Sequence, residues 1–207
     1  EPLINIDEVI KEDAALDDSR IMKSLWDLIN EADIIVSHNG NKFDIPRINA
    51  RFIINGLDPT KPYFSIDTCQ VARKQFGFSS NKLDALATYF NIDHKLETSF
   101  ELWKLCLEGD ERALRFMLEY NKKDVEILEE VYLKLRPWIK NHPNMGNLQG
   151  DKQVCCNCGS DNINRVRDKF YYTSVGQYPI YRCMDCGAMS RGRKSVFNFP
   201  DLNSISR

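Results

Sequence analysis

Two Cys-x-x-Cys-Gly motifs constrain the fold of this 207-residue chain more strongly than any other feature. The first runs Cys155-Cys156-Asn157-Cys158-Gly159, and the second runs Cys183-Met184-Asp185-Cys186-Gly187. One tight turn can present two thiolates at this spacing to a single tetrahedral Zn²⁺ ion. Because both motifs have the same form, we predict one structural Zn²⁺ bound by Cys155, Cys158, Cys183 and Cys186.

A β-hairpin is predicted between the two motifs. Residues 169–173 and 178–182 flank Val175-Gly176-Gln177 as two strands flank a turn, so the second motif would follow a strand. The whole module, residues 152–196, is too small for a core of its own. Metal binding is therefore expected to supply most of its folding free energy, as in other small zinc β-ribbons.

The cysteine count leaves alternatives open. Cys156 could replace Cys155 as a ligand, although only the choice of Cys155 mirrors the second motif. The four thiols could also form two disulfides. The total of seven cysteines is odd, however, so they cannot all be paired, which favours a reducing, intracellular compartment. Cys69 and Cys106 are expected to be buried small hydrophobic residues.

The ribbon is the basic part of the chain. Residues 151–196 hold eight Lys and Arg against four Asp, whereas residues 1–150 hold 19 basic and 25 acidic residues. Basic and aromatic side chains together suit phosphate contact and base stacking, although cross-strand aromatic pairs also stabilise hairpins that bind nothing. The basic residues are Arg165, Arg167, Lys169, Arg182, Arg191, Arg193 and Lys194, and the aromatic ones are Phe170, Tyr171, Tyr172, Tyr178 and Tyr181.

Upstream of the ribbon, apolar periodicity predicts alternating helices and strands, and hence an α/β fold. Helices are expected over about 19–29, after the cap Asp17-Asp18-Ser19, and over 44–54, 68–76, 83–90 and 110–138; strands are expected over 34–36 and 63–66. Two strands are too few for a sheet, so we expect N-terminal residues missing from this chain to complete it. The expected organisation is a domain over 1–141, a linker over 142–151, the ribbon over 152–196 and a tail over 197–207.

Two carboxylates occupy unusual places. Asp124 falls in the apolar stripe of the long helix, one turn after Tyr120, and a buried ionised carboxylate needs a metal, a cation or hydrogen bonds. Pairing with Lys123 or another cation is the alternative to a metal. Asp44 follows a predicted strand and precedes Pro46, a pattern that by itself indicates an N-cap.

Considered together, these residues resemble a known family. His38-Asn39-Gly40-x-x-Phe43-Asp44 and Tyr120-x-x-x-Asp124 resemble the second and third motifs of DnaQ-like 3′–5′ exonucleases of the ribonuclease-H-like superfamily, and the tyrosine is typical of the DEDDy branch. Further likeness lies in Ser65-Ile66-Asp67-Thr68 and Asn81-Lys82-Leu83-Asp84. With the zinc ribbon included, residues 17–195 resemble a group of small predicted exonucleases common in bacteriophages and bacteria.

The resemblance implies a ribonuclease-H-like exonuclease fold and a site in which four acidic residues hold two Mg²⁺ or Mn²⁺ ions. Asp44 and Asp124 would be two of these ligands, and Tyr120 would orient the attacking water. The first motif of the family, Asp-x-Glu, is absent from this chain. In Ile6-Asp7-Glu8 the two acids are adjacent, so a strand would point them to opposite faces.

The resemblance also suggests which other polar residues contact substrate. Four lysines could meet substrate phosphates unless they are solvated surface charges: Lys42, Lys82, Lys122 and Lys123. His38 is expected to hold its loop in place, whereas Asp67 and Asp84 are expected to be structural acids at a strand end and a helix start.

We therefore expect a 3′–5′ exonuclease that hydrolyses phosphodiester bonds at nucleic-acid 3′ ends, single-stranded DNA in preference to RNA, in the cytoplasm of a bacterium or a phage-infected host. An Asp-x-Glu motif would come from missing N-terminal residues or a second chain, and a polymerase or replication complex is a further expected partner. No apolar run is long enough for a membrane span. The alternatives are a non-catalytic nucleic-acid-binding accessory subunit of replication or repair, and a zinc-ribbon scaffold for protein partners.

Overall fold

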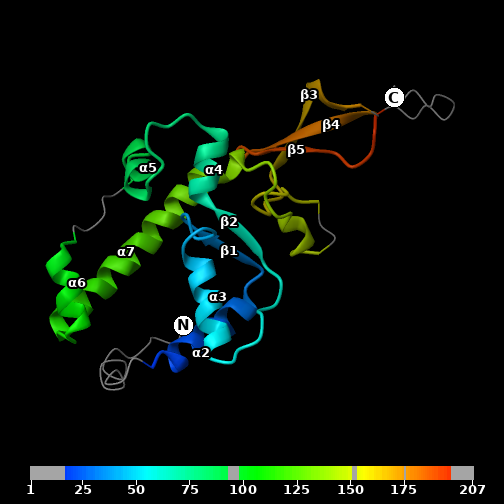
Figure 1. Cartoon of the computed structure of the whole chain (residues 1–207). Helices are drawn as coiled ribbons and strands as arrows, with labels where there is room; N and C mark the ends of the chain where they lie inside the picture. Colours follow the sequence, from blue (N-terminus) through cyan, green and yellow to red (C-terminus); the bar gives the residue numbers. More distant parts are fainter. Residues whose placement is uncertain (1–16, 93–97, 151–152, 175, 197–207) are drawn as a thin grey trace. The chain divides into compact units, whose positions relative to one another are not determined.

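The computed structural model describes residues 17–92, 98–150, 153–174 and 176–196 (Figure 1). The chain divides into two compact units, Glu1–Lys134 and Leu135–Arg207. Asp7 and Glu8, Val175 of the expected turn, and the expected tail over 197–207 all lie outside the described residues.

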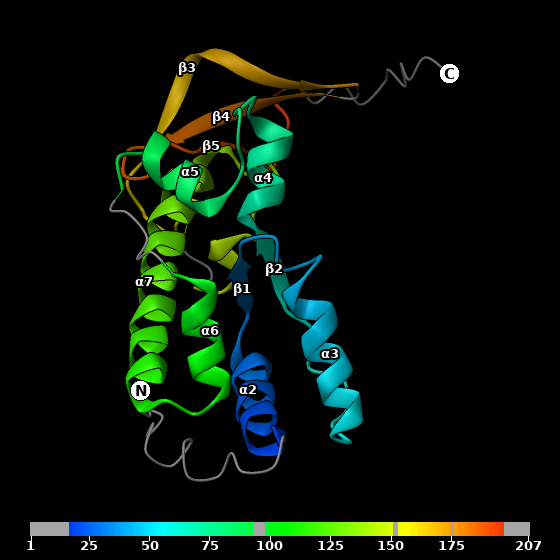
Figure 2. The ribbon, with the colours of Figure 1, turned by 60° about the vertical axis from the view of Figure 1, so that its left-hand side comes forward.

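The first unit is built on a β-α-β crossover. Strand β1 (Ile34–Ser37) pairs in parallel with β2 (Phe64–Asp67), from Ile34 opposite Phe64 to Ser37 opposite Asp67. Two parallel strands need a crossover, and helix α3 (Asp44–Ile54) supplies it. Helix α2 (Ser19–Glu31) precedes β1, and β1 and β2 lie side by side in both ribbon views (Figure 2). Both predicted strands and both predicted helices are confirmed, with β2 displaced by one residue.

Four more helices follow in this unit: α4 (Thr68–Gln75), α5 (Leu83–Tyr89), α6 (Phe100–Leu107) and α7 (Glu111–Leu135). The expected extension of the long helix to 138 is wrong, because residues 136–138 form a 3₁₀ turn, η2 (Arg136–Trp138). Pro137 has no backbone N–H to continue the α-helical ladder. Helix α6 was not predicted; its apolar side chains are largely exposed, with Leu107 90% accessible, so no amphipathic pattern marks it.

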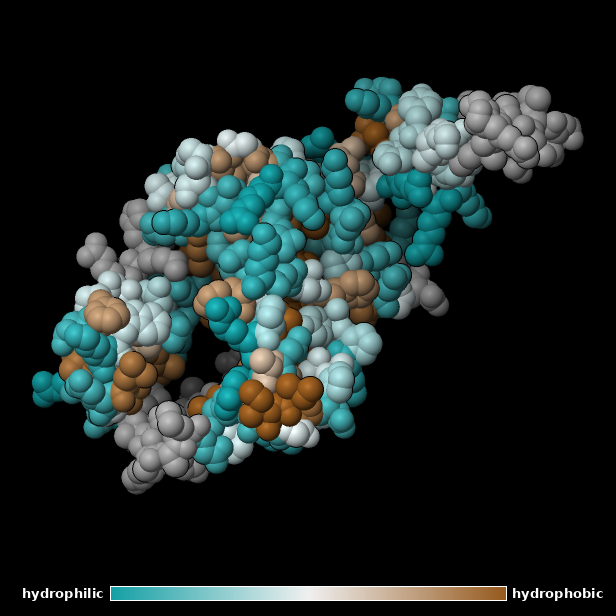
Figure 3. Space-filling model, in the orientation of Figure 1, coloured by the Kyte–Doolittle hydropathy of each residue, from teal (hydrophilic) through white to brown (hydrophobic). Residues whose placement is uncertain are grey.

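The core of the first unit draws on several elements. Ile66 of β2, Ala72 of α4, Leu86 of α5 and Ile127 and Val131 of α7 are all buried. Val131 and Leu135 of the stripe predicted for α7 are buried and Leu128 is half-buried, whereas Ile127 is buried although the predicted stripe did not include it. The face seen in Figure 3 is mostly hydrophilic, with apolar patches near α6 and at the far ends of α2 and α3.

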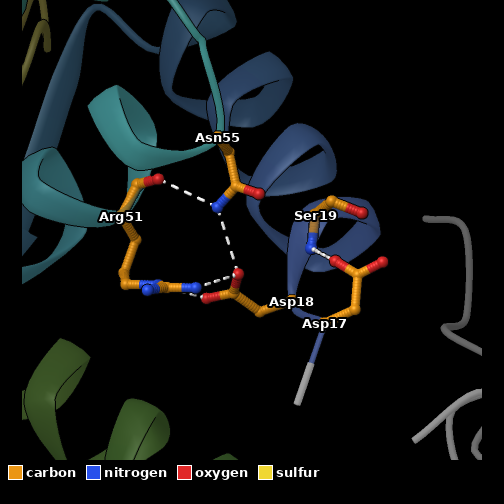
Figure 4. Close-up of polar contacts among 5 residues, drawn as sticks. All are labelled: Asp17, Asp18, Ser19, Arg51 and Asn55. Atoms are coloured by element: carbon orange, nitrogen blue, oxygen red, sulfur yellow. Dashed lines mark hydrogen bonds and ion pairs between the residues drawn. The ribbon is translucent and has the colours of Figure 1, made fainter. Parts of the chain in front are cut away.

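The start of α2 differs from the expected cap. Asp18 occupies the N-cap position but makes no side-chain cap bond. Its carboxylate instead accepts hydrogen bonds from Arg51 Nε at 2.6 Å, Arg51 Nη2 at 2.5 Å and Asn55 Nδ2 at 3.0 Å, while Asp17 Oδ1 accepts from Ser19 N (Figure 4). Asp18 therefore joins α2 to the C-terminal end of α3.

This cluster predicts an acid-sensitive contribution to stability. The hydrogen bonds from Arg51, then those from Asn55, lower the pKa of the Asp18 carboxyl from 3.8 to about 2. Because the folded-state pKa is the lower one, the contribution is present above about pH 4 and is lost as the pH falls toward 2. We expect Asp18→Asn to lower the urea midpoint at pH 6 and to have progressively less effect toward pH 2. An equal effect at both pH values would contradict the assignment.

The second unit contains an antiparallel sheet in the order β3-β4-β5, made of β3 (Ile163–Thr173), β4 (Gly176–Cys183) and β5 (Met189–Arg191). The predicted hairpin is therefore present, with longer strands than expected. The register of β3 shifts between Val166 and Phe170, where three exposed residues, 167–169, form a bulge.

The residues expected to form a linker contribute contacts to the second unit. They include a second 3₁₀ turn, η3 (Met145–Asn147), and Met145 N donates to Cys156 O at 2.9 Å. Asn157 Nδ2 donates to Arg136 O at 2.8 Å. These bonds explain why the division between the units falls after Lys134, ahead of the boundary expected at 141. Among the helices in the described ranges, none combines the length and apolar character that crossing a membrane requires.

Candidate functional site

The sulfurs of Cys155, Cys158, Cys183 and Cys186 gather into one cluster. Each Sγ lies within 4.8 Å of the others, with Cys155 3.8 Å from Cys186 and Cys158 3.6 Å from Cys183. Four sulfurs at ~2.3 Å from a tetrahedral Zn²⁺ would be ~3.8 Å apart. All seven cysteines of the chain are free thiols, so disulfides do not explain the cluster. The donor type and the spacing both fit a closed zinc site.

The two cysteine motifs have the same backbone structure. Gly159 N donates to Cys155 O at 2.9 Å, and Gly187 N donates to Cys183 O at 3.0 Å. Both glycines have positive φ, +80° and +77°, which closes each turn without a side-chain clash. Cys155, Cys183 and Ala188 are buried together and form the small core of the second unit. Two matching turns thus face one another across the four sulfurs.

Burial and backbone donors act on these thiols in opposite directions. Burial raises the pKa of Cys158 and of Cys186. Burial also raises the pKa of Cys183, but hydrogen bonds from the backbone N–H groups of Cys186 and Asp185, together with those from the Cys158 and Cys186 thiols, bring that pKa down to about 7. The turns therefore already stabilise a thiolate at one position of the cluster.

An acidic residue inside the second motif braces the two turns. Asp185 accepts hydrogen bonds from Ser160 Oγ at 2.5 Å and Asn162 Nδ2 at 2.7 Å, and these bonds lower its pKa. No local pattern in the sequence indicates this contact, because Ser160 and Asn162 follow the first motif and Asp185 lies within the second. Cys156 lies outside the sulfur cluster, with its Sγ 3.1 Å from Ser190 Oγ.

The acidic residue expected in the first unit lies at the start of α3. Asp44 is the first residue of the helix and is exposed, while the N-cap position belongs to Phe43, which makes no side-chain cap bond. The N-cap interpretation of Asp44 is therefore wrong. A Cβ on Gly40 would collide with Ser37 and would lie 3.5 Å from Asp44 Oδ2, so the loop before Asp44 requires glycine.

Asp67 shapes the same loop from the end of β2. Its buried carboxylate accepts from Asn39 N at 2.9 Å and Asn41 N at 3.3 Å, and it also caps α4 through Gln70 N at 3.1 Å. The expectation of a structural role for Asp67 agrees with these bonds. The parallel register of β1 and β2 could have indicated that Asp67 bonds to this loop, because Asp67 lies opposite Ser37, the residue directly before His38.

His38 fastens this loop to two further segments. Its Nδ1 lies 2.9 Å from Thr68 Oγ1, and its Nε2 lies 3.0 Å from Asn81 O. Thr68 Oγ1 also donates to Ser37 O at 3.0 Å. These contacts agree with the expectation that His38 holds the loop. They also bring the segment ending at Lys82 next to the loop that precedes Asp44.

Replacing Asp67 is expected to cost stability. Asp67→Ala removes the cap of α4 and leaves two loop N–H groups without their acceptor, so the free energy of unfolding should fall by about 2–4 kcal/mol. Urea denaturation followed by circular dichroism measures this loss. Asp84→Ala, which removes an exposed acid from the first turn of α5, is the matched control and should change stability by less than about 0.5 kcal/mol. Equal losses of unfolding free energy in the two variants would contradict the role of Asp67 in holding the loop.

The second acidic residue lies on α7. Tyr120 and Asp124 are half-buried and one helical turn apart, and Asp124 Oδ1 is inaccessible to solvent. Carboxylate oxygens suit Mg²⁺ or Mn²⁺. Within the described residues, however, the cysteine cluster is the one group of three or more metal-ligating side chains. Asp44 and Asp124 thus offer the right donor atoms but not a complete site.

The basic residues expected to contact phosphates differ in whether an acidic side chain pairs with them. Lys122 pairs with Glu119 at 2.9 Å and Lys123 with Glu126 at 3.5 Å, so both charges have neighbours on α7. Lys42 and Lys82 are exposed and form no ion pair with a carboxylate of the described residues. The seven basic residues of the ribbon are likewise exposed and without such a pair.

Most of the chain is similar to known proteins. Residues 4–136 match the model of a family described as the RNase_H superfamily. The chain is 25% identical over 169 residues, 81% of its length, to DNA polymerase III PolC-type of Ureaplasma parvum serovar 3, and 32% identical over 103 residues, 45% of its length, to Protein NEN2 of Arabidopsis thaliana. It spans only 11% and 21% of these two relatives. No solved structure matches it.

Proposed function

Because this chain belongs to the RNase_H superfamily, we propose that it is a metal-dependent 3′–5′ exonuclease of the DEDDy type that acts on single-stranded DNA ends. The observation that carries the proposal is the pair Tyr120 and Asp124, half-buried and one helical turn apart on α7, with one carboxylate oxygen of Asp124 inaccessible to solvent. A two-metal nuclease needs carboxylates that bind its cations, and this pair matches the spacing of the third motif. The name of one relative, a DNA polymerase, favours DNA over RNA.

Each named residue has a role in this proposal. Asp44 and Asp124 would bind the Mg²⁺ or Mn²⁺ ions, which when bound activate water and stabilise the departing 3′ oxygen. Tyr120 orients the attacking water through its hydroxyl. Lys42 and Lys82 contact phosphates of the strand, and the loop bonds of His38 and Asp67 keep the backbone around Asp44 in place.

Two more acidic ligands are part of the proposal. An Asp-x-Glu motif would come from another segment of the protein or from a second chain, and it would complete the sheet beside β1. The ribbon over 152–196, joined to the nuclease domain over 1–141 by the segment 142–151, would hold one Zn²⁺ through its four clustered cysteines. The protein would act in the cytoplasm of a bacterium or phage-infected host, alone or with a polymerase.

The proposal is tested by an end-specific nuclease assay on the protein purified from its native source, so that every segment or partner it needs is present. Strands labelled at the 3′ end should release labelled mononucleotide at once when Mg²⁺ or Mn²⁺ is added, whereas strands labelled at the 5′ end should shorten gradually. Release of internal fragments, or no hydrolysis with either ion, would reject the proposal. Parallel DNA and RNA strands decide the preference between them.

A non-catalytic accessory subunit is the second candidate. The incomplete acidic set of the described residues favours it, because two carboxylates alone do not hold two divalent ions. It predicts binding to single strands without hydrolysis by the native protein. The same assay, run together with a binding measurement, separates the two candidates.

A further inference from the structure

One face of the ribbon sheet combines arginines with two tyrosines, of which Tyr171 is exposed and Tyr178 half-buried. In the register of the three strands, Tyr171 lies opposite Tyr178, and Arg182 lies opposite Met189. Alternation along β4 places Tyr178 and Arg182 on the same side, and Arg191, opposite Ile180, joins them. We call Tyr171, Tyr178, Arg182, Met189 and Arg191 the tyrosine–arginine face.

Arg191 is held in place on this face by aromatic rings. Its guanidinium carbon lies 5.3 Å from the ring centre of Tyr171 and 4.9 Å from that of Tyr178. It forms no ion pair with a carboxylate in the described part of the chain, so its N–H donors can bind an external anion. Tyr171 remains 49% exposed and Met189 46% exposed, so part of the apolar surface is also accessible to a ligand.

The charge balance of the ribbon favours an extended polyanion. Residues 153–196 contain seven Arg and Lys against three Asp, and one of these, Asp185, already accepts two hydrogen bonds. Tyrosines and arginines also anchor protein–protein interfaces, but an excess of spaced cations over acids suits a partner with a repeated negative charge. A single nucleic-acid strand presents both a base face and a repeated negative charge.

We propose that the tyrosine–arginine face binds single-stranded nucleic acid, with a base stacked on Tyr171 and phosphates contacted by Arg182 and Arg191. This inference rests on the proposed function in that nucleic acid is the substrate. It goes beyond that function because it assigns the binding of single strands to one face of the β3-β4-β5 sheet. Arg165, opposite Tyr181, and Tyr172, opposite Gln177, lie on the other face. The inference therefore removes these two residues from the expected nucleic-acid contacts, and they serve as matched controls.

Binding of a fluorescein-labelled oligothymidylate to the full chain with its zinc, measured by fluorescence anisotropy without Mg²⁺ or Mn²⁺, tests the face. Arg182→Ala should weaken binding about fivefold or more and reduce the salt slope by about 0.7, the value for one lost phosphate contact on a single strand. Arg165→Ala should change the affinity by less than about twofold. Equal losses from the two variants would overturn the choice of face.

Stacking is tested separately with an abasic strand of the same length. Tyr171→Leu should weaken binding of the oligothymidylate about tenfold and of the abasic strand hardly at all, because only the oligothymidylate has bases that can stack on the ring. Tyr171→Trp should restore binding, and Tyr172→Leu should have little effect. Full zinc content in each variant shows that the ribbon is folded. Equal weakening of both strands by Tyr171→Leu would overturn the stacking role.

A small substrate allows hydrolysis at the carboxylate site to be tested separately from strand binding by the tyrosine–arginine face. Hydrolysis of the p-nitrophenyl ester of thymidine 5′-monophosphate needs the carboxylate site but offers no strand to the ribbon. A protein that binds strands through the face but does not hydrolyse the ester refutes the nuclease alone. A protein that hydrolyses the ester while the variants of the face bind strands normally refutes the face alone.

Discussion

Replacing Asp124 by alanine is expected to abolish nuclease activity while leaving the protein folded. Its carboxylate lies half-buried on α7 with one oxygen inaccessible to solvent, a position in which a proposed metal ligand cannot be replaced by water or by a neighbouring exposed acid. Loss of such a ligand should lower kcat by at least ~10³-fold, about 4 kcal/mol of transition-state stabilisation. The measurement is mononucleotide release from a 3′-labelled strand at saturating Mg²⁺.

Two control variants separate the loss of a metal ligand from the loss of side-chain volume at Asp124 and from the loss of a negative charge elsewhere. Asp124→Asn keeps the size of the side chain and should be nearly as inactive, whereas Asp84→Ala removes an exposed acid from α5 and should retain parental activity. Strand binding without divalent ions should be unchanged in all three variants. Retention of more than about a tenth of the activity by Asp124→Ala would rule out its role as a metal ligand.

Removing zinc is expected to unfold the second unit. Its buried core consists of two cluster cysteines and Ala188, so the sheet has little apolar burial to stabilise it without a metal. Structural zinc sites contribute about 10–16 kcal/mol in comparable small modules. Cys183→Ser should therefore abolish zinc binding and the hydrogen-exchange protection of β3 and β4. The parent should contain one zinc per chain by elemental analysis.

Cys156→Ser is the matched control for the zinc prediction. Cys156 stands next to a cluster cysteine, but its sulfur contacts Ser190 instead of the other thiols. This variant should keep one zinc per chain and the exchange protection of the parent. Zinc loss in Cys156→Ser, or its retention in Cys183→Ser, would contradict the assignment of the four ligands.

Sequence alone predicted the features that depend on local spacing. The cysteine motifs, the strands at 34–36 and 63–66 and the helix starting at Asp44 are present because each arises from residues close together in the chain. The apolar stripe of α7 likewise follows from a helical repeat of three and four residues. The family resemblance stated from the motifs agrees, at the level of the superfamily, with the match over residues 4–136.

Long-range contacts could not be predicted in the same way. Asp18 has a cap-like sequence, yet its carboxylate binds Arg51, because α2 and α3 pack together and a guanidinium provides a stronger partner than the helix N–H groups. Helix α6 has too many exposed apolar residues for its pattern to mark a buried side. A local signal for this helix is Ser99, whose Oγ accepts a hydrogen bond from Leu102 N and caps its first turn.

The sequence by itself determined which residues are candidates for the chemistry: four thiols in two matching motifs, a tyrosine and an aspartate one helical turn apart, and a basic segment rich in aromatic residues. Only the tertiary structure decided which side chains lie together. The β1–β2 register brought Asp67 to the loop before Asp44, and the register of β3 with β4 placed Tyr171 and Arg165 on opposite faces. Strand pairing joins residues distant in the chain, so its register depends on the whole folded unit and not on any short motif.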